Sequence, residues 1–186
     1  MNFITPLFQV YKLSIYTFLT SFILDFTLCL PTTKKYMKFN TDLYVDNIHA
    51  NFKNLFLLSP FYYYLAYYIL IDNSKNYFSK LNTFVLLFIQ NLFYHYAHKY
   101  MHVIPKIRWM HDFHHKYVET TPTIGNAVSV AEYQVAYVLP FLIGSFIVRP
   151  SPIDLQVTVF IISSLNMLIH SQELKEIKYL SFLVSP

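Results

Sequence analysis

The chain has 186 residues, of which 55% are hydrophobic and 13% are charged, whereas a soluble domain usually carries about 25% charged residues. Two glycines exclude a Gly-rich phosphate-binding loop, and the single cysteine, Cys29, excludes an internal disulfide or a thiolate metal site. The net charge of +4 comes from basic residues scattered singly between apolar segments, which indicates membrane topology and no nucleic-acid partner.

Long apolar segments follow one another along the chain, without the alternation of period two that strands would show. A helix that crosses a bilayer needs roughly 17–25 residues. The core of a soluble protein of 186 residues is too small to bury so many long apolar segments. The sequence therefore predicts an all-α, polytopic membrane helix bundle with about four to five spans. The expected segments are residues 8–30, 55–71, 81–97, 128–148 and 153–169.

Polar residues and prolines mark the ends of these segments. Pro31 closes the first segment, Pro105 ends the helix that follows residue 81, and a Pro-rich turn at residues 149–152 separates the last two. Two acidic residues, Asp25 and Glu132, lie within apolar segments. A carboxylate there is costly unless it faces protein or water.

The distribution of basic residues predicts which way the bundle faces. If all five segments cross, one side receives residues 31–53, 98–126 and 170–186, and basic residues favour the cytoplasmic side. We expect an integral, multi-pass membrane protein with its clustered histidines facing the cytoplasm, in the endoplasmic reticulum if the source is eukaryotic. That side holds 10 of the 14 basic residues, namely Lys34, Lys35, Lys38, Lys53, Lys99, Lys106, Arg108, Lys116, Lys175 and Lys178.

Six of the eight histidines lie within a short stretch, at spacings that suit metal binding. His98 and His102 are four residues apart and share one helix face. His111, His114 and His115 repeat this geometry after a loop that contains Pro105. Two such faces can direct several imidazoles at one volume, and neutral imidazole binds iron, copper, nickel and zinc. The spacing therefore predicts a metal site.

The roles of the three remaining histidines are less clear from the sequence. His95 lies three residues before His98 and joins the same stripe. His170 lies where the fifth segment returns to the histidine side, so it is either a ligand or a residue of the membrane interface. His49 stands alone in a polar stretch, where we expect a solvated loop.

The two histidine clusters resemble the H-x-x-x-H and H-x-x-H-H boxes of the fatty acid hydroxylase and sterol desaturase superfamily. The resemblance covers roughly residues 80–186 and continues through residues 116–122, Asn126, Glu132-Tyr133 and residues 139–141. It implies a metal-ligand set of His98, His102, His111, His114, His115 and His170. It also implies roles beside the metal or along the substrate for His95, Asp112 and Glu132, and Glu119 is a further carboxylate that could orient an imidazole.

The resemblance implies an iron-dependent lipid oxidoreductase, either a sterol desaturase or a fatty acid or sterol hydroxylase. Such an enzyme uses two iron ions and O2 to remove hydrogen from an unactivated C–H bond of a lipid or sterol. The electrons would come from a cytochrome b-type or ferredoxin-like donor. Residues 1–80 would then form membrane-anchoring helices, and residues 81–186 a partial catalytic domain.

One departure from the family pattern keeps alternatives open. The family carries another H-x-x-H-H box after the position of His170, and no histidine follows His170 here, as if the domain were truncated. Six candidate ligands would leave one of two irons under-coordinated, so the number of bound irons could be two, one or none. The alternatives are a catalytically inactive remnant with residual metal or lipid binding and, less favoured, a metal transporter or haem-binding membrane protein.

Overall fold

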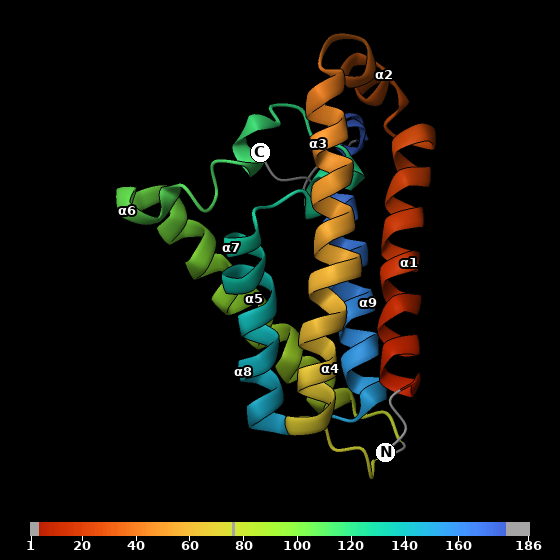
Figure 1. Cartoon of the computed structure of the whole chain (residues 1–186), viewed down its shortest axis with the longest axis vertical. Helices are drawn as coiled ribbons and strands as arrows, with labels where there is room; N and C mark the ends of the chain where they lie inside the picture. Colours follow the sequence, from red (N-terminus) through yellow and green to blue (C-terminus); the bar gives the residue numbers. More distant parts are fainter. Residues whose placement is uncertain (1–3, 76, 178–186) are drawn as a thin grey trace.

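The structure, a computed structural model, describes residues 4–75 and 77–177, which form helices and connecting turns without a strand (Figure 1). Most helices of the bundle run along its long axis, and α5 crosses it obliquely (Figure 1). Their bounds are α1 Ile4–Thr27, α3 Thr41–Phe52, α4 Ser59–Ile69, α5 Lys80–Val103, α7 Val130–Glu132, α8 Leu139–Val148 and α9 Pro152–Ile169.

Three stretches of helix are long and apolar enough to cross a membrane. They are Pro6–Thr27, Val130–Val148 and Pro152–Ile169. They confirm the prediction of an all-α membrane helix bundle. The two remaining expected segments, 55–71 and 81–97, lie largely in α4 and α5; that these two also cross stays a prediction.

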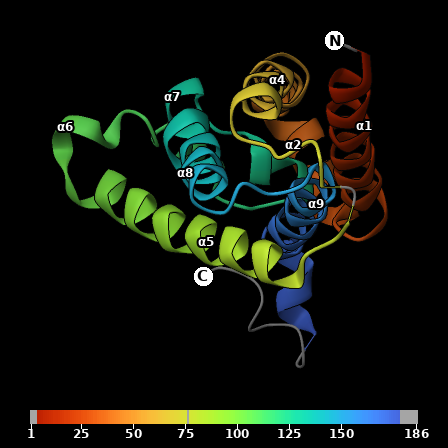
Figure 2. The same ribbon diagram turned by 90° about the horizontal axis from the view of Figure 1, so that it is seen from below.

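The long helices alternate in direction, so their connections gather at two opposite ends of the bundle (Figure 1). The end of α1, the end of α5, the start of α7 and the end of α9 share one end. Residues 70–75, 77–79 and 149–151 lie at the opposite end, where the Asp72 amide donates to the Pro150 carbonyl at 2.9 Å. Seen from below, α5 crosses the bundle obliquely and reaches well beyond the other helices (Figure 2).

Residues 31–53, expected as a loop, are helical instead. They form α2, Leu30–Phe39, and then α3. The expectation was wrong because polar residues in this stretch are not solvated: Asn47 and Asn51 are completely buried against other segments. His49 is exposed, as expected, but on a helix. Lys178, which was counted among the basic residues of the histidine side, and the residues that follow it lie outside the described residues.

Two prolines interrupt the backbone hydrogen bonds of the bundle helices in the same way. Pro60 and Pro140 each follow a π-helical turn, η1 Lys53–Leu58 and η4 Tyr133–Val138. Proline has no amide hydrogen to donate to the preceding turn, so carbonyls there need other donors. Side chains of neighbouring helices supply them: Ser14 Oγ donates to Leu55 O at 2.6 Å, and Gln90 Nε2 donates to Ala136 O at 3.2 Å.

Close packing of α5 against α8 depends on Gly144. A Cβ atom at this position would lie 3.0 Å from Leu86 Cδ2 and 3.7 Å from Ile89 Cγ2. We expect Gly144→Val to push α5 and α8 apart and to lower the free energy of unfolding by about 1–3 kcal/mol. Thermal unfolding of the protein in detergent measures the change. Ile147→Val, on the exposed face of α8, is the control; equal melting temperatures for both variants would contradict this packing.

Candidate metal centre

The last turns of α5 carry the first two histidines of the cluster. α5 begins at a cap in which Ser79 Oγ accepts from the Asn82 amide, and it ends at Val103 because Pro105 follows closely. His98 and His102 lie one turn apart, with their Nε2 atoms at 3.1 Å. The Nε2 atoms of the two rings therefore already lie side by side.

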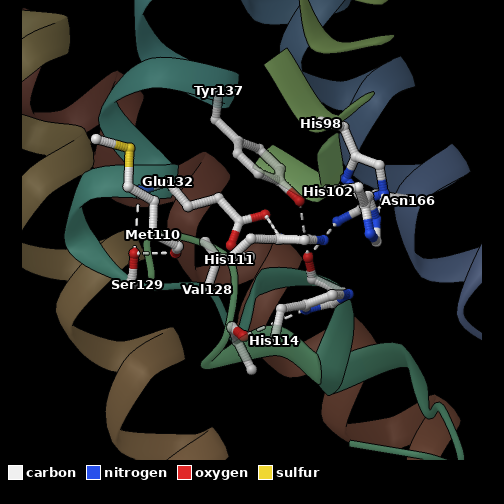
Figure 3. Close-up of polar contacts among 12 residues, drawn as sticks. His98, His102, Met110, His111, His114, Val128, Ser129, Glu132, Tyr137 and Asn166 are labelled. Carbon is white, nitrogen blue, oxygen red and sulfur yellow. Dashed lines mark hydrogen bonds and ion pairs between the residues drawn. The ribbon is translucent and has the colours of Figure 1, made fainter. Parts of the chain in front are cut away.

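The loop after α5 brings two more imidazoles to the same point. It begins with a short helix, α6 Pro105–Arg108, and continues through turns. The His111 ring lies 4.4 Å from that of His98 and 4.8 Å from that of His102. The His115 ring lies 4.7 Å from that of His102. Ligand atoms of His98, His102 and His111 all lie within 4.8 Å of one another (Figure 3).

His114 and His170 extend the cluster on the other side of His111. The rings of His114 and His111 are 5.5 Å apart, and those of His114 and His170 are 5.4 Å apart. His170 directly follows α9, 55 or more residues along the chain from the other five. The structure thus joins all six histidines of the expected ligand set into one network of ring contacts, centred on His111.

Glu132 fixes the orientation of His111. Both side chains are only 1% exposed, and His111 Nδ1 lies 2.7 Å from Glu132 Oε1. The carboxylate accepts the Nδ1 hydrogen, which leaves the Nε2 lone pair free, as the partners of metal-bound histidines do. His111 Nε2 and His98 Nδ1 are buried without a hydrogen-bond partner in the protein. Such atoms are costly, and a metal ion bound here would satisfy them.

His114 and His170 are oriented by backbone carbonyls in the same way. His114 Nδ1 lies 3.4 Å from Ala127 O, and His170 Nδ1 lies 2.8 Å from Asn166 O. A carbonyl oxygen can only accept, so each Nδ1 carries the hydrogen and each Nε2 keeps its lone pair. The donor set is therefore suited to a metal ion that prefers imidazole, such as iron.

A short hydrogen-bonded link joins Glu132 to the histidine loop. Ser129 Oγ accepts from the Glu132 amide at 3.1 Å and donates to Met110 O at 2.6 Å (Figure 3). Ser129 therefore caps α7 and at the same time holds the residue that precedes His111. Both partners of the His111–Glu132 pair are positioned by one hydroxyl.

Other residues singled out in the sequence lie apart from the cluster. His95 is exposed, with its ring against that of Tyr96. Asp112 lies at the surface, where its Oδ1 pairs with Arg108 Nε at 3.5 Å. Glu119 pairs with Lys35 at the surface. Of Asp112, Glu119 and Glu132, it is Glu132 that accepts a hydrogen bond from an imidazole.

Three contributors to the site were not predicted. The Tyr94 ring stacks on that of His98 at 5.5 Å. Tyr137 OH and Asn166 Nδ2 both donate to Gly125 O, at 3.1 Å and 3.0 Å. Tyr94 and Asn166 each precede a histidine of the cluster by four residues, and this helical spacing is the signal that could have found them.

An apolar cavity lies next to the histidines, inside the bundle. It has a volume of about 130 Å³ and lies between α1, α4, α8 and α9. Its wall is mostly apolar, with residues such as Leu13, Phe141 and Ile162. Two of its polar lining residues, Tyr137 and Asn166, border the cluster. Asn166 O accepts from His170 Nδ1, and the Tyr137 ring packs on that of Tyr94, which stacks on His98. The cavity and the histidine cluster thus adjoin each other.

The fold and the cluster define a class: a membrane helix bundle that gathers histidines, suited to hold a metal, at one end beside an apolar cavity. The family model for fatty acid hydroxylase matches residues 83–185, more than half of the chain, and the chain belongs to this family. Family membership confirms the predicted resemblance and indicates a lipid-modifying oxygenase. Neither a curated protein nor a solved structure matches the chain.

Burial favours the neutral form of His114 and His115. It lowers the pKa of His114 to about 3, with a further contribution from His170, and it also lowers the pKa of His115. A lowered pKa means that the proton is bound only in more acidic solution, so the rings stay available to a metal at neutral pH.

We therefore expect the His114 ring of the metal-free protein to remain unprotonated between about pH 8 and about pH 5, whereas an ordinary histidine titrates near 6.5. Nuclear magnetic resonance spectra of protein labelled with ¹⁵N in its histidines measure this, and the missing signal in His114→Gln identifies the ring. A midpoint near the ordinary value would contradict the burial seen here.

Proposed function

We propose that this protein is an iron-dependent lipid oxidoreductase that uses O2 and an external electron donor. The observation that carries the proposal is the network of six imidazoles at one end of a membrane bundle, three of them with Nδ1 engaged and Nε2 free. The iron would be held by His98, His102, His111, His114, His115 and His170. Family membership supports iron as the metal.

Bound iron would supply the activation of O2 that an unactivated C–H bond requires. The chain's own residues prepare the site for it. Glu132 holds the Nδ1 hydrogen of His111, and the carbonyls of Ala127 and Asn166 do the same for His114 and His170.

The apolar cavity is our candidate for the binding site of the substrate hydrocarbon. Its walls come from helices that face lipid on their other sides, so a lipid or sterol would reach it without passing through water. Its wall at Tyr137 and Asn166 borders the histidines. Hydroxylation and desaturation both begin with removal of one hydrogen atom, so the substrate assay has to detect both types of product.

Electrons would come from a cytochrome b-type or ferredoxin-like donor. Lys106, Arg108 and Lys116 are exposed on the loop that carries the histidines, and they would favour docking of an acidic partner. We propose that this end of the bundle faces the cytoplasm, in the endoplasmic reticulum membrane if the protein is eukaryotic. The excess of basic residues at this end supports that orientation.

A second candidate is a protein that binds metal or lipid without catalysis. The observation in its favour is the number of imidazoles: six are enough for one metal ion but few for two. The iron content of the loaded protein therefore separates the two candidates.

We expect purified protein loaded with Fe²⁺ without oxygen to hold two irons per chain if it is an oxygenase. His114→Ala combined with His115→Ala should lose the metal, because two of the six imidazoles disappear. Elemental analysis measures the content, and His49→Ala with His95→Ala is the matched control outside the cluster. One iron per chain would favour the non-catalytic candidate, and unchanged metal in the His114/His115 variant would refute the site.

Filling the cavity should stop lipid oxidation and leave the metal in place. Val159 lines the cavity, and a tryptophan there would occupy the space of a hydrocarbon chain. We expect Val159→Trp to lower product formation at least about tenfold with unchanged iron content. Lipid profiling of cells that supply a reductase system measures it. Leu165→Trp, exposed on the same helix, is the control; equal activity of both variants would remove the cavity from the proposal.

A further inference from the structure

Asp25 is completely buried near the end of an otherwise apolar helix, α1. Its Oδ1 accepts from the Thr123 amide at 3.1 Å. Its Oδ2 accepts from Thr123 Oγ1 at 2.5 Å and from Thr121 Oγ1 at 3.2 Å. Both threonines belong to residues 121–128, which are all buried and which we call the strap. A buried carboxylate is costly in such a place unless it is fully hydrogen-bonded, and the strap supplies these donors.

Three asparagines hold the same strap from a second helix. Asn47, Asn51 and Asn54 follow one another at helical spacing on α3 and η1, and all are buried. Asn47 Nδ2 donates to Thr123 Oγ1 at 2.8 Å, and Asn51 Nδ2 donates to Thr123 O at 2.7 Å. Asn54 Nδ2 donates to two further strap carbonyls, those of Asn126 and Val128, at 3.1 and 3.0 Å. Together with Asp25 they fix the strap along its length.

The opposite side of the strap touches the histidine cluster. Ala127 O accepts from His114 Nδ1, and Gly125 O accepts from Asn166 Nδ2. The contact at Gly125 is close: a Cβ atom there would lie 3.0 Å from His170 Nδ1. The position of the strap therefore decides where the carbonyl that orients His114 lies and how much room His170 has.

We propose that Asp25, Asn47, Asn51 and Asn54 are positioning residues of the metal centre. They hold the strap so that His114 and His170 present their Nε2 atoms to the cluster. All four lie before residue 83, outside the part of the chain that the family model matches. The N-terminal helices would thus complete the site as well as anchor it. The inference rests on the proposed function insofar as the oriented rings are meant for a metal.

The test has to separate positioning from simple stabilisation, and Asp154 offers a matched control. It too is a completely buried aspartate with several donors, since Ser79 N, Asn82 Nδ2 and Ser151 N bond to its carboxylate. It lies at the start of α9, at the end of the bundle opposite to the histidines. Asp25→Asn and Asp154→Asn should both lower the melting temperature, but only the first should disturb the imidazoles.

The first measurement uses metal-free protein. Spectra of ¹⁵N-labelled histidine report which ring nitrogen carries the hydrogen. We expect Asp25→Asn and Thr123→Val to shift the His114 and His170 signals away from the Nδ1–H form, and Asp154→Asn and Thr123→Ser to leave them unchanged. Thr123→Ser keeps the hydroxyl that bonds to Asp25, so the threonine pair gives the answer even if Asp25→Asn does not fold. Unchanged His114 and His170 signals in Thr123→Val would overturn the proposal.

The second measurement uses Co²⁺ as a coloured probe. We expect Asp25→Asn or Thr123→Val to weaken Co²⁺ binding about tenfold and to change the visible absorption of the bound ion, because misplaced partners of a ligand typically cost that much. The Asp154→Asn and Thr123→Ser proteins should bind as the wild type does. Equal binding by all four would overturn the proposal. If the wild type binds no Co²⁺, the proposed metal function fails instead, and the metal-free spectra alone decide the positioning role.

Discussion

A polar group inside a membrane helix bundle has to find its partner within the protein, because lipid offers none. This constraint explains most of the structure. Asp25, the asparagines of α3, Gln90 and Glu132 are buried among apolar residues, and each bonds to a group on a different segment of the chain. These bonds decide which helices lie together. They also determine the position of the buried strap.

The histidine cluster follows from the same constraint. Imidazoles can be buried as neutral rings, but each ring has two nitrogen atoms that need partners. In His111, His114 and His170 the protein satisfies Nδ1, and for the buried Nε2 of His111 it provides no partner. A set of lone pairs directed at a common volume is what a metal centre requires. The hydrogen-bond partners are thus as important to the site as the histidines themselves.

Much of this site could be predicted from the sequence. The spacing of His98 and His102 placed them on one helix face, and the apolar segments predicted the bundle. His111, His114 and His115 converge as expected, although turns and a short 3-10 helix replace the expected regular helix. Glu132 was expected near the metal, and the structure places it against His111. Local spacing was sufficient wherever the partners are neighbours in the chain.

The rest could not be predicted, because it depends on pairs that are far apart in the sequence. Asp25 and Thr123 are 98 residues apart, and Asn51 and Thr123 are 72 apart. No local sequence pattern indicates a partner that is so far away in the chain. The polar residues 31–53 were therefore expected to form a solvated loop, whereas they bury asparagines against the strap. His95 shares the stripe of His98 but lies a turn further from the loop that carries His111, and its ring is exposed.

The order of these residues along the chain has a consequence for biogenesis. Asp25 and the asparagines of α3 are synthesised before the strap, so the surface that receives it exists when the strap leaves the ribosome. The five histidines between residues 98 and 115 emerge before the strap, and the groups that orient His111 and His114, Glu132 and Ala127 O, follow them. His170 arrives last, at the end of α9, and closes the cluster. Insertion of α9 is therefore also the step that brings the sixth histidine of the network to the other five.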